Sequence, residues 1–221
     1  MQRILKITTD GSFTLFVPSL NEHFHSVHGA FTESNHIFIK AGFNYIAPHF
    51  EAINILEFGL GTGLNALLTI QKSLEIDKPI FYHALEKFPV LPQEFSFDKA
   101  LLSTFDNLNL QEILYQHWES DYNIDKNRTI HKSQIDFNDF VATKKYHLIY
   151  FDAFAPEIQP ELWSPLLFQK IYDAMEYGGM LLTYCAKGQF KRDLRSVGFT
   201  VEGLPGPPGK REITRATKSF C

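Results

Sequence analysis

From residue 53 onward, apolar runs typical of strands alternate with stretches of helical spacing, and this alternation constrains the fold more than any other feature. It predicts strands at residues 53–58, 80–85, 129–135, 147–151 and 180–184, and helices at residues 64–74, 93–118, 166–175 and 189–197. Such alternation is typical of a largely parallel sheet with helices on both faces, whose ligands bind beyond the carboxyl ends of the strands. The predicted fold class is therefore α/β.

Both ends of the chain are predicted to add antiparallel pairs. Residues 1–17 alternate around a turn at residues 9–12, which predicts a β-hairpin, and residues 32–45 have mixed helical spacing. Residues 199–202 and 212–216 are predicted to form a closing pair of strands around a loop rich in Gly and Pro. We therefore expect an N-terminal extension at residues 1–45 and one main domain at residues 46–221.

Length and composition limit the class of protein. A chain of 221 residues has room for one ordinary domain, and two cysteines, Cys185 and Cys221, cannot form a disulfide framework. No apolar run reaches the roughly 20 residues of a membrane helix, and the first ten residues lack the apolar core of a signal peptide. We expect a cytoplasmic protein without membrane contact. The net charge of −4 means that nucleic acid could bind only to a local patch.

A glycine loop joins the strand at residues 53–58 to the following helix. Gly59, Gly61 and Gly63 follow the spacing G-x-G-x-G, and Glu57 precedes them at the end of the strand. Glycines at such a turn allow the backbone to approach a ligand closely, with a helix N-terminus behind it. A carboxylate at Glu57 suits a cationic ligand such as S-adenosylmethionine better than a pyrophosphate. A purely structural turn is the alternative.

Two further acids follow the next strands. Glu86 ends the strand at residues 80–85, where a carboxylate can accept hydrogen bonds from ribose hydroxyls. Asp136 follows the strand at residues 129–135, where it could accept from an adenine amino group while Phe137 stacks on the ring. Acids at the ends of three successive strands resemble the class I S-adenosylmethionine-dependent methyltransferases, which have a Rossmann-like seven-stranded sheet with a reversed final hairpin.

A fourth motif follows the strand at residues 147–151. Asp152, Phe154 and Pro156 put a carboxylate and a rigid wall where methyl transfer would occur. An amine must lose its proton before it attacks a methyl group, and Asp152 could orient that amine and offset its growing charge. The arrangement resembles, in looser form, the Asp/Asn-Pro-Pro-Tyr/Phe motif of amine methyltransferases.

Several blocks occur together and in order: residues 22–34, 57–65, 84–89, 152–156, 160–163, 183–188 and 205–212. The set closely resembles the methyltransferase domain of the bifunctional tRNA 5-methylaminomethyl-2-thiouridine biosynthesis protein family, MnmC, over residues 11–216. That resemblance implies transfer of a methyl group from S-adenosylmethionine to the aminomethyl nitrogen of a tRNA wobble uridine. It also implies that Asn65 and Lys87 bind the cofactor and that Ser26 and Glu33 help to close the site.

Bifunctional members carry a second, FAD-dependent domain that exposes the amine. The chain ends at Cys221 without a G-x-G-x-x-G motif, so we expect a stand-alone methyltransferase whose substrate comes from elsewhere, and a separate FAD-dependent oxidoreductase is a candidate partner.

The C-terminal segment is basic. Residues 187–221 hold eight Lys and Arg against three Asp and Glu, which is what a phosphate-binding face for tRNA requires. Lys187, Lys210 and Arg211 are the candidates nearest to the predicted strand ends. A modified base must leave its stack to reach the methyl donor, and aromatic side chains could flank it. The candidates are Phe154, Trp163 and Tyr184, and each could equally belong to the core.

Other functions remain open from the sequence. An aminopropyltransferase that makes polyamines, another small-molecule amine methyltransferase, a nicotinamide-dependent oxidoreductase and a non-catalytic tRNA-binding module all fit the fold class. The G-x-G-x-G spacing argues against the oxidoreductase, and the basic segment argues against a polycationic substrate. Three histidines, His23, His25 and His28, could ligate zinc, but no Cys lies nearby and methyl transfer needs no metal, so no metal site is expected.

Overall fold

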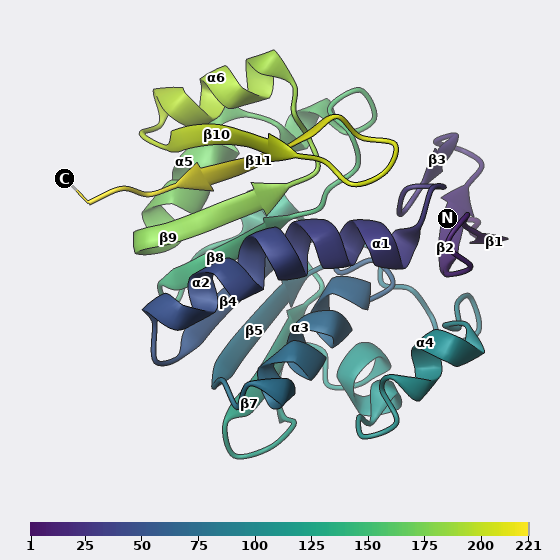
Figure 1. Ribbon diagram of the computed structural model, residues 1–221. Coiled ribbons are helices and arrows are strands. Elements are labelled where there is room, and N and C mark those ends of the chain that lie inside the picture. The colour runs from purple at the N-terminus through teal and green to yellow at the C-terminus, as the bar shows by residue number, and fades with distance from the viewer. Residues whose placement is uncertain (221) are drawn as a thin grey trace.

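The computed structural model describes residues 1–220 and contains two sheets (Figure 1). The small sheet is antiparallel and consists of β1 (Ile4–Ile7), β2 (Phe13–Val17) and β3 (Glu22–His23), which confirms the predicted N-terminal hairpin. The large sheet has the order β10-β11-β9-β8-β4-β5-β7-β6. Its strands are β4 (Ile53–Phe58), β5 (Ile80–Leu85), β6 (Asp121–Asn123), β7 (Arg128–Ser133), β8 (Tyr146–Phe151), β9 (Met175–Thr183), β10 (Thr200–Pro205) and β11 (Glu212–Thr217).

Five central strands, β4, β5, β7, β8 and β9, run parallel, and β11 lies antiparallel between β9 and β10. This confirms the α/β prediction and the reversed closing pair. An eighth strand, β6, pairs antiparallel with β7 at the other edge, and no sequence signal pointed to it. Because β10 and β11 follow the last parallel strand, the carboxyl ends of β4, β5 and β8 stay open for a ligand.

The helical segments form two layers. They are α1 (Ala30–Ser34), η1 (Asn35–Phe43), α2 (Asn44–Ile46), η2 (Ala47–His49), α3 (Leu64–Glu75), α4 (Lys99–Ser103), η3 (Gln111–Tyr115), η4 (Phe137–Asp139), η5 (Pro160–Leu162), α5 (Pro165–Ala174) and α6 (Gly188–Ser196). The first four follow one another without a break, as one long rod over the sheet (Figure 1). Within residues 1–220, none of them is both long and apolar enough to cross a bilayer.

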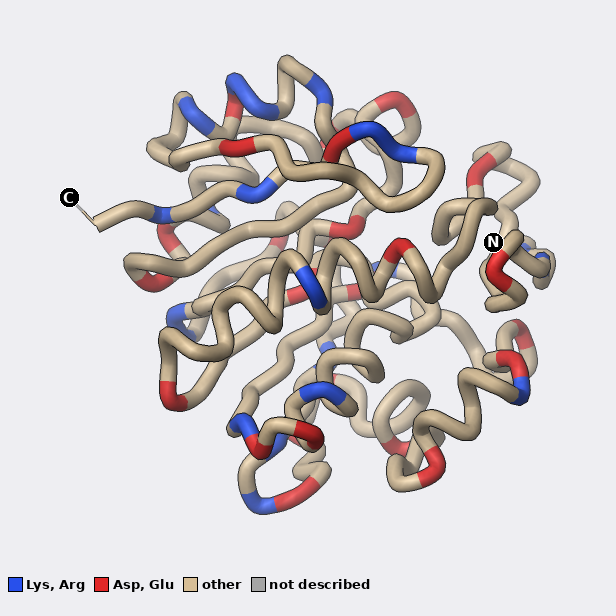
Figure 2. Tube along the Cα trace, viewed as in Figure 1, with Lys and Arg blue, Asp and Glu red and all other residues tan. Residues whose placement is uncertain are grey.

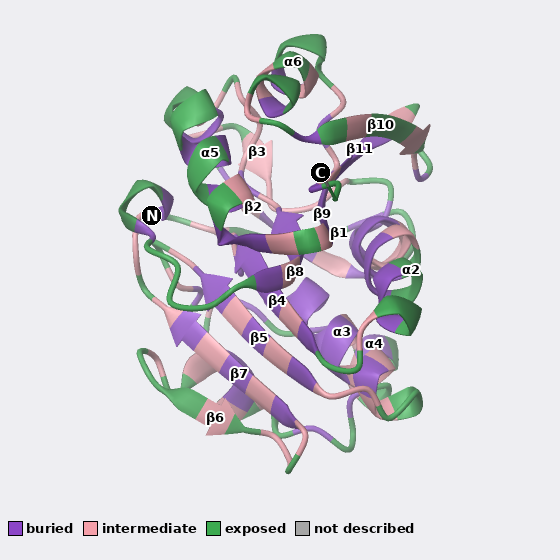
Figure 3. Cartoon of the chain, turned by 90° about the vertical axis from the view of Figure 1, so that its left-hand side faces the viewer, coloured by how far each residue is buried: buried purple, intermediate pink, exposed green. Residues whose placement is uncertain are grey.

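Period-two alternation explains how the central strands serve both layers. In β8, Leu148 and Tyr150 pack with the rod and α3, whereas Ile149 and Phe151 pack with α5 and α6. Both faces of the sheet are therefore covered, which is why β8 is apolar and buried at every position except His147 (Figure 3). Cys185 is buried and free, and Cys221 lies outside the described residues.

The long helix predicted at residues 93–118 is wrong. Only the short segments α4 and η3 are helical there. Phe95 and Phe97 both reach the core, with their ring centres 4.9 Å apart, whereas residues two apart on a helix point to different sides. Asp98 then starts α4, because its side chain accepts a hydrogen bond from the backbone N–H of Leu101 at 2.9 Å. The apolar residues of this segment pack in the core although most of its backbone forms neither helix nor strand.

The glycine pair that follows the helix predicted at residues 166–175 indicates that Gly178 and Gly179 stop this helix, and that prediction is wrong. The helix α5 ends at Ala174, and β9 begins at the next residue and includes both glycines. Gly178 has φ +78°, and the pairing of β8 with β9 shifts register between Tyr146 and Leu148. A Cβ on Gly179 would lie 3.0 Å from the carbonyl oxygen of His147. The two glycines therefore permit a bulge at the start of the strand.

Candidate functional site

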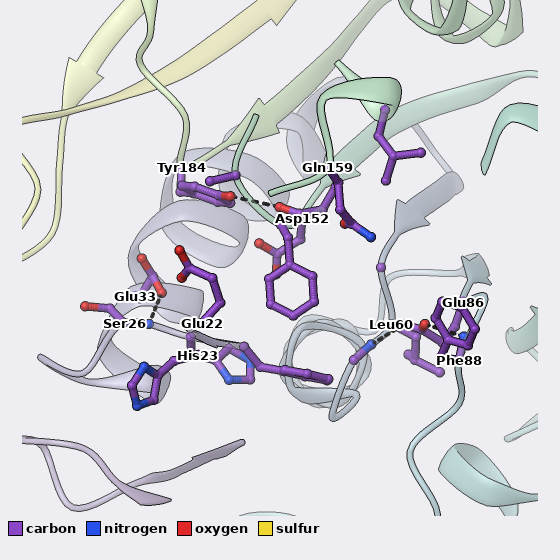
Figure 4. A pocket seen from close by; sticks show the side chains of 18 of the residues that line it. Glu22, His23, Ser26, Glu33, Leu60, Glu86, Phe88, Asp152, Gln159 and Tyr184 are labelled. Atoms are coloured by element: carbon purple, nitrogen blue, oxygen red, sulfur yellow. Dashed lines mark hydrogen bonds between the residues drawn. The ribbon is translucent and has the colours of Figure 1, made fainter. Parts of the chain in front are cut away.

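A cavity of about 530 Å³ lies at the carboxyl ends of the parallel strands (Figure 4). Its volume is in the range of small-molecule sites. The loops after β4, β5 and β8 form its floor, residues 22–28 cover one side, and the loop between β10 and β11 reaches its rim. It brings together twelve of the predicted catalytic, cofactor-binding and substrate-binding residues, namely Ser26, Glu33, Gly59, Gly61, Glu86, Lys87, Asp136, Phe137, Asp152, Phe154, Tyr184 and Lys210.

The three loop glycines are held in the left-handed region, with φ +96° at Gly59, +54° at Gly61 and +82° at Gly63. A Cβ on Gly59 would lie 2.7 Å from the carbonyl oxygen of Asp152, and one on Gly61 would lie 3.2 Å from the ring of Phe24. Gly63 caps α3 and does not line the cavity. The loop therefore requires glycine for its backbone conformation and for close packing with both neighbours.

Glu86 holds the glycine loop from the end of β5. Its Oε2 accepts a hydrogen bond from the backbone N–H of Gly61 at 3.1 Å, and its Oε1 accepts from that of Phe88 at 2.8 Å. A carboxylate has about four acceptor positions, so both oxygens can still accept from a ligand in the cavity. This acid can therefore shape the loop and receive hydroxyl groups at once.

Asp136 is kept ionised beside Glu86. The Lys87 ammonium donates to its Oδ2 at 2.7 Å, and the backbone N–H of Asn138 donates to its Oδ1 at 2.9 Å. These bonds, chiefly the one from Lys87, lower the pKa of Asp136 below its ordinary value. Phe137 is mostly buried, with its ring edge-on to Phe58 at 5.4 Å.

Asp152 follows β8 at the centre of the cavity. Its Oδ2 accepts a hydrogen bond from Asn65 Nδ2 at 2.9 Å. Burial raises the pKa of Asp152 from 3.8 to about 7, and the negative charge of Glu33 adds to the rise. The hydrogen bond from Asn65 and the charge of Lys210 act in the opposite direction. This carboxyl can therefore exchange a proton near neutral pH.

Glu57 and Asn65 lie behind Asp152 and do not line the cavity. Glu57 has no exposed surface; its Oε1 accepts from Asn65 Nδ2 at 3.0 Å and its Oε2 accepts from the Tyr82 hydroxyl at 2.9 Å. Burial raises the pKa of Glu57 well above its ordinary value. In this geometry Glu57 therefore does not reach a ligand in the cavity.

Two distant segments meet above Asp152. Glu33, at the start of the rod, accepts the backbone N–H of Ser26 at 2.7 Å and lies 3.3 Å from the ammonium of Lys210. The same ammonium lies 4.6 Å from the ring centre of Tyr184, whose hydroxyl donates to the carbonyl oxygen of Ala153 at 2.8 Å. Figure 4 shows Glu33, Tyr184 and Asp152 around the same space. The N-terminal segment and the β10–β11 loop thus enclose one side of the cavity.

Four predicted substrate residues lie outside the cavity: Pro156, Trp163, Lys187 and Arg211. Trp163 is 8% exposed, and its indole N–H donates to the carbonyl oxygen of Phe154 at 2.8 Å. It packs in the core behind Phe154, whereas Phe154 and Tyr184 border the cavity. Lys187 forms a surface ion pair with Glu157, and Arg211 is exposed.

The structure adds cavity residues to which the sequence analysis gave no role in binding the cofactor or the substrate, including Phe24, His25 and Gln159. The ring of Phe24 meets that of Phe154 edge-on at 5.4 Å. Burial lowers the pKa of His25 to about 4, so its imidazole is neutral at pH 7. All three lie in or beside the quoted sequence blocks, which is the one signal that could have found them. No group of three or more His, Cys, Asp or Glu in residues 1–220 is arranged to hold a metal ion.

Comparison with known sequences gives one consistent picture. A family model described as S-adenosyl-L-methionine-dependent methyltransferase matches residues 110–219. The bifunctional tRNA 5-methylaminomethyl-2-thiouridine biosynthesis protein MnmC of Cupriavidus metallidurans is 27% identical, over 98% of this chain and 34% of its own length. The MnmC protein of Idiomarina loihiensis is also 27% identical, over 88% of this chain and 35% of its own length. This chain therefore spans about a third of these relatives.

Solved structures agree on the fold. MnmC2 from Aquifex aeolicus has a TM-score of 0.85 at 22% identity, over 99% of this chain and 72% of its own. Spermidine synthase from Thermotoga maritima has a TM-score of 0.55 at 12% identity, over 100% of this chain and 81% of its own. These likenesses concern the fold, and they confirm the predicted Rossmann-like class I sheet.

Proposed function

Because this chain is an MnmC-like S-adenosyl-L-methionine-dependent methyltransferase, we propose that it methylates the amino nitrogen of 5-aminomethyl-2-thiouridine at the tRNA wobble position, giving 5-methylaminomethyl-2-thiouridine. The observation that carries the proposal is the Asp152 carboxyl, which has a pKa of about 7 and faces the same cavity as Glu86 and the glycine loop. The names of the relatives support tRNA as the substrate class.

The residues around the cavity fit the methyl donor. Glu86 has acceptor positions left for the ribose hydroxyls, and the ionised Asp136 can accept from the adenine amino group. Gly59 and Gly61 line the cavity without side chains, so a ligand can lie against the backbone there. When bound, S-adenosylmethionine supplies a methyl group on a sulfonium sulfur, which an uncharged amine can attack.

The charges of the cavity favour an amine. The side chains of six Asp and Glu line it against those of three Lys and Arg: Glu22, Glu33, Glu86, Asp136, Asp152 and Glu161 against Arg3, Lys87 and Lys210. Such a cavity attracts an ammonium group and disfavours a phosphate. We propose that ionised Asp152 accepts a hydrogen bond from the substrate nitrogen, orients it and takes up the proton that the nitrogen loses. Phe154 and Tyr184 would flank the uracil ring.

The RNA backbone would bind outside this acidic cavity. Figure 2 shows Lys and Arg along α6 and in the loop between β10 and β11. Two cations of the segment are engaged internally, because Arg215 is buried against Glu202 at 2.7 Å and Lys218 donates to the carbonyl oxygens of Tyr172 and Met175. We therefore propose that the exposed Arg192, Arg195 and Arg211 make phosphate contacts.

The test is methyl transfer in vitro. The protein is incubated with isotope-labelled S-adenosylmethionine and tRNA that carries 5-aminomethyl-2-thiouridine, and the digested nucleosides are analysed by mass spectrometry. We expect a gain of one labelled methyl group on that nucleoside, and none with Asp152→Asn. A parallel reaction with putrescine and decarboxylated S-adenosylmethionine tests aminopropyl transfer. Absence of labelled nucleoside, with a product in the polyamine reaction, would refute the proposal.

A further inference from the structure

Asn65 connects two carboxyl groups that come from different strands. It is the second residue of α3, directly behind the glycine loop, and is 3% exposed. Glu57 is near the end of β4, and Asp152 follows the adjacent strand β8. The Asn65 amide nitrogen lies 3.0 Å from Glu57 Oε1 and 2.9 Å from Asp152 Oδ2. One side-chain amide thus lies between a fully buried acid and an acid that borders the cavity.

The hydrogen-bonding capacity of these groups fixes the orientation of the amide. Asn65 Nδ2 carries two hydrogens, and one is directed to each carboxyl group. Asn65 Oδ1 is buried without a hydrogen-bond partner within residues 1–220. Turning the amide around would place this oxygen against both carboxyl groups. The second oxygen of Glu57 accepts from Tyr82, so Glu57 is itself held firmly.

We propose that Asn65, held in place by Glu57, is a positioning residue that orients the Asp152 carboxyl toward the substrate amine, and that neither Asn65 nor Glu57 contacts the methyl donor. The proposal rests on the proposed function in so far as Asp152 faces an amine. It replaces the cofactor-binding role expected for both residues from the sequence.

The same hydrogen bond tunes the acidity of Asp152. Burial and the charge of Glu33 raise the pKa of Asp152, and the bond from Asn65 lowers it. Removing the amide therefore raises that pKa further above about 7, so that a higher pH is needed to ionise the carboxyl. A residue that only supports the fold would leave this titration in place, which makes pH dependence the informative measurement.

The experiment compares Asn65→Ala and Asn65→Ser with Ser73→Ala as the matched control. Ser73 is buried on the same helix and binds the carbonyl oxygen of Ile70, far along the chain from either carboxyl group. For the Asn65 variants we expect kcat to fall about 100-fold, as for a misplaced catalytic group. The rise of kcat with pH should move to higher pH, and the Kd for S-adenosylmethionine in calorimetry should stay within about threefold, as for lost orientation without lost contact. Ser73→Ala should keep the wild-type pH profile.

Two further measurements make the result decisive. Glu57→Gln preserves volume, and its Kd for S-adenosylmethionine should stay within about threefold because Glu57 does not line the cavity. Carbon-13 NMR of Asp-labelled protein follows the Asp152 titration without any substrate. If the wild-type protein fails to methylate tRNA but this titration moves upward in Asn65→Ser, the proposed function fails and the positioning role stands.

The proposal is overturned by a tenfold or greater loss of donor affinity in Glu57→Gln, which would place Glu57 at the donor. It is equally overturned if the Asp152 titration stays unchanged in a folded Asn65 variant. If neither Asn65 variant folds, the donor affinity of Glu57→Gln decides.

Discussion

The raised pKa of Asp152 predicts that Asp152→Asn stabilises the protein at alkaline pH while abolishing its activity. A carboxyl group whose folded pKa lies above its unfolded value of 3.8 contributes stability that is present below pH 3.8 and lost as pH rises through about 7. A rise of about three pKa units corresponds to about 4 kcal/mol of unfolding free energy. Asparagine carries no charge to bury, and its Oδ1 can still accept from Asn65. Because water in the cavity screens part of the charge, we expect a gain of about 2 to 4 kcal/mol at pH 8.

Urea unfolding of both proteins from pH 4.5 to pH 8.5 measures this difference. The gain should grow with pH and level off only about one unit above the pKa of about 7, where wild-type Asp152 is almost fully ionised. The buried His25 also makes stability depend on pH in this window, because its pKa falls from 6.5 in the unfolded chain to about 4 in the folded protein, but it is present in both proteins and cancels in the difference. A difference that is flat with pH would refute the assignment of a raised pKa to Asp152, and with it the proton exchange that the proposed mechanism requires.

Three further predictions concern the donor, the loop and the RNA. Glu86→Ala should weaken S-adenosylmethionine binding at least tenfold in calorimetry, because it removes the acceptors and frees the glycine loop; unchanged binding would remove Glu86 from the donor site. Gly59→Ala should cost on the order of 3 kcal/mol of stability, because its Cβ would meet a carbonyl oxygen at 2.7 Å. Gly11→Ala, with φ +86° and nothing within 4 Å, should cost only about 1 kcal/mol, and equal losses in urea unfolding would contradict the steric argument. Affinity for tRNA should fall as salt rises, and Arg192→Glu and Arg211→Glu should each lower the slope of log K against log salt by about 1; an unaltered slope would exclude them from the RNA face.

Much of the fold could be predicted because its signals are local. The strand at residues 53–58 is mostly apolar and is followed directly by Gly59, which is typical of a buried parallel strand with both faces covered. The segment at residues 93–118 has no comparable sequence pattern that indicates its structure. Phe95 and Phe97 are placed by gaps in the core that distant residues create, so their spacing carries no period to recognise. Gly178 likewise serves a bulge whose need arises from the pairing with β8.

In the site, too, some features could be predicted from local sequence signals and others depend on residues distant in the sequence. Acids at strand ends could be selected from the chain alone, because parallel strands bring their carboxyl ends to one edge. The sequence could not distinguish an acid that faces the cavity, such as Asp152, from one that lies behind it, such as Glu57. That distinction depends on Asn65, which reaches both from another element. The sequence makes Trp163 and Phe154 equal candidates for flanking the substrate base. In the structure Trp163 is buried in the core, and Phe154 borders the cavity.

The contact between Glu33 and Lys210 has a consequence for how the protein is made. One partner belongs to the first 33 residues and the other to the last loop of the sheet, and both line the same cavity. A ribosome synthesises Lys210 long after Glu33, because the strands β4 to β10 lie between them in the sequence. The sheet from β4 to β8 can form while the chain is still emerging, but the cavity is enclosed only after residue 210 has left the exit tunnel. The enclosed shape of the cavity therefore forms only after the strands β4 to β10 have been synthesised.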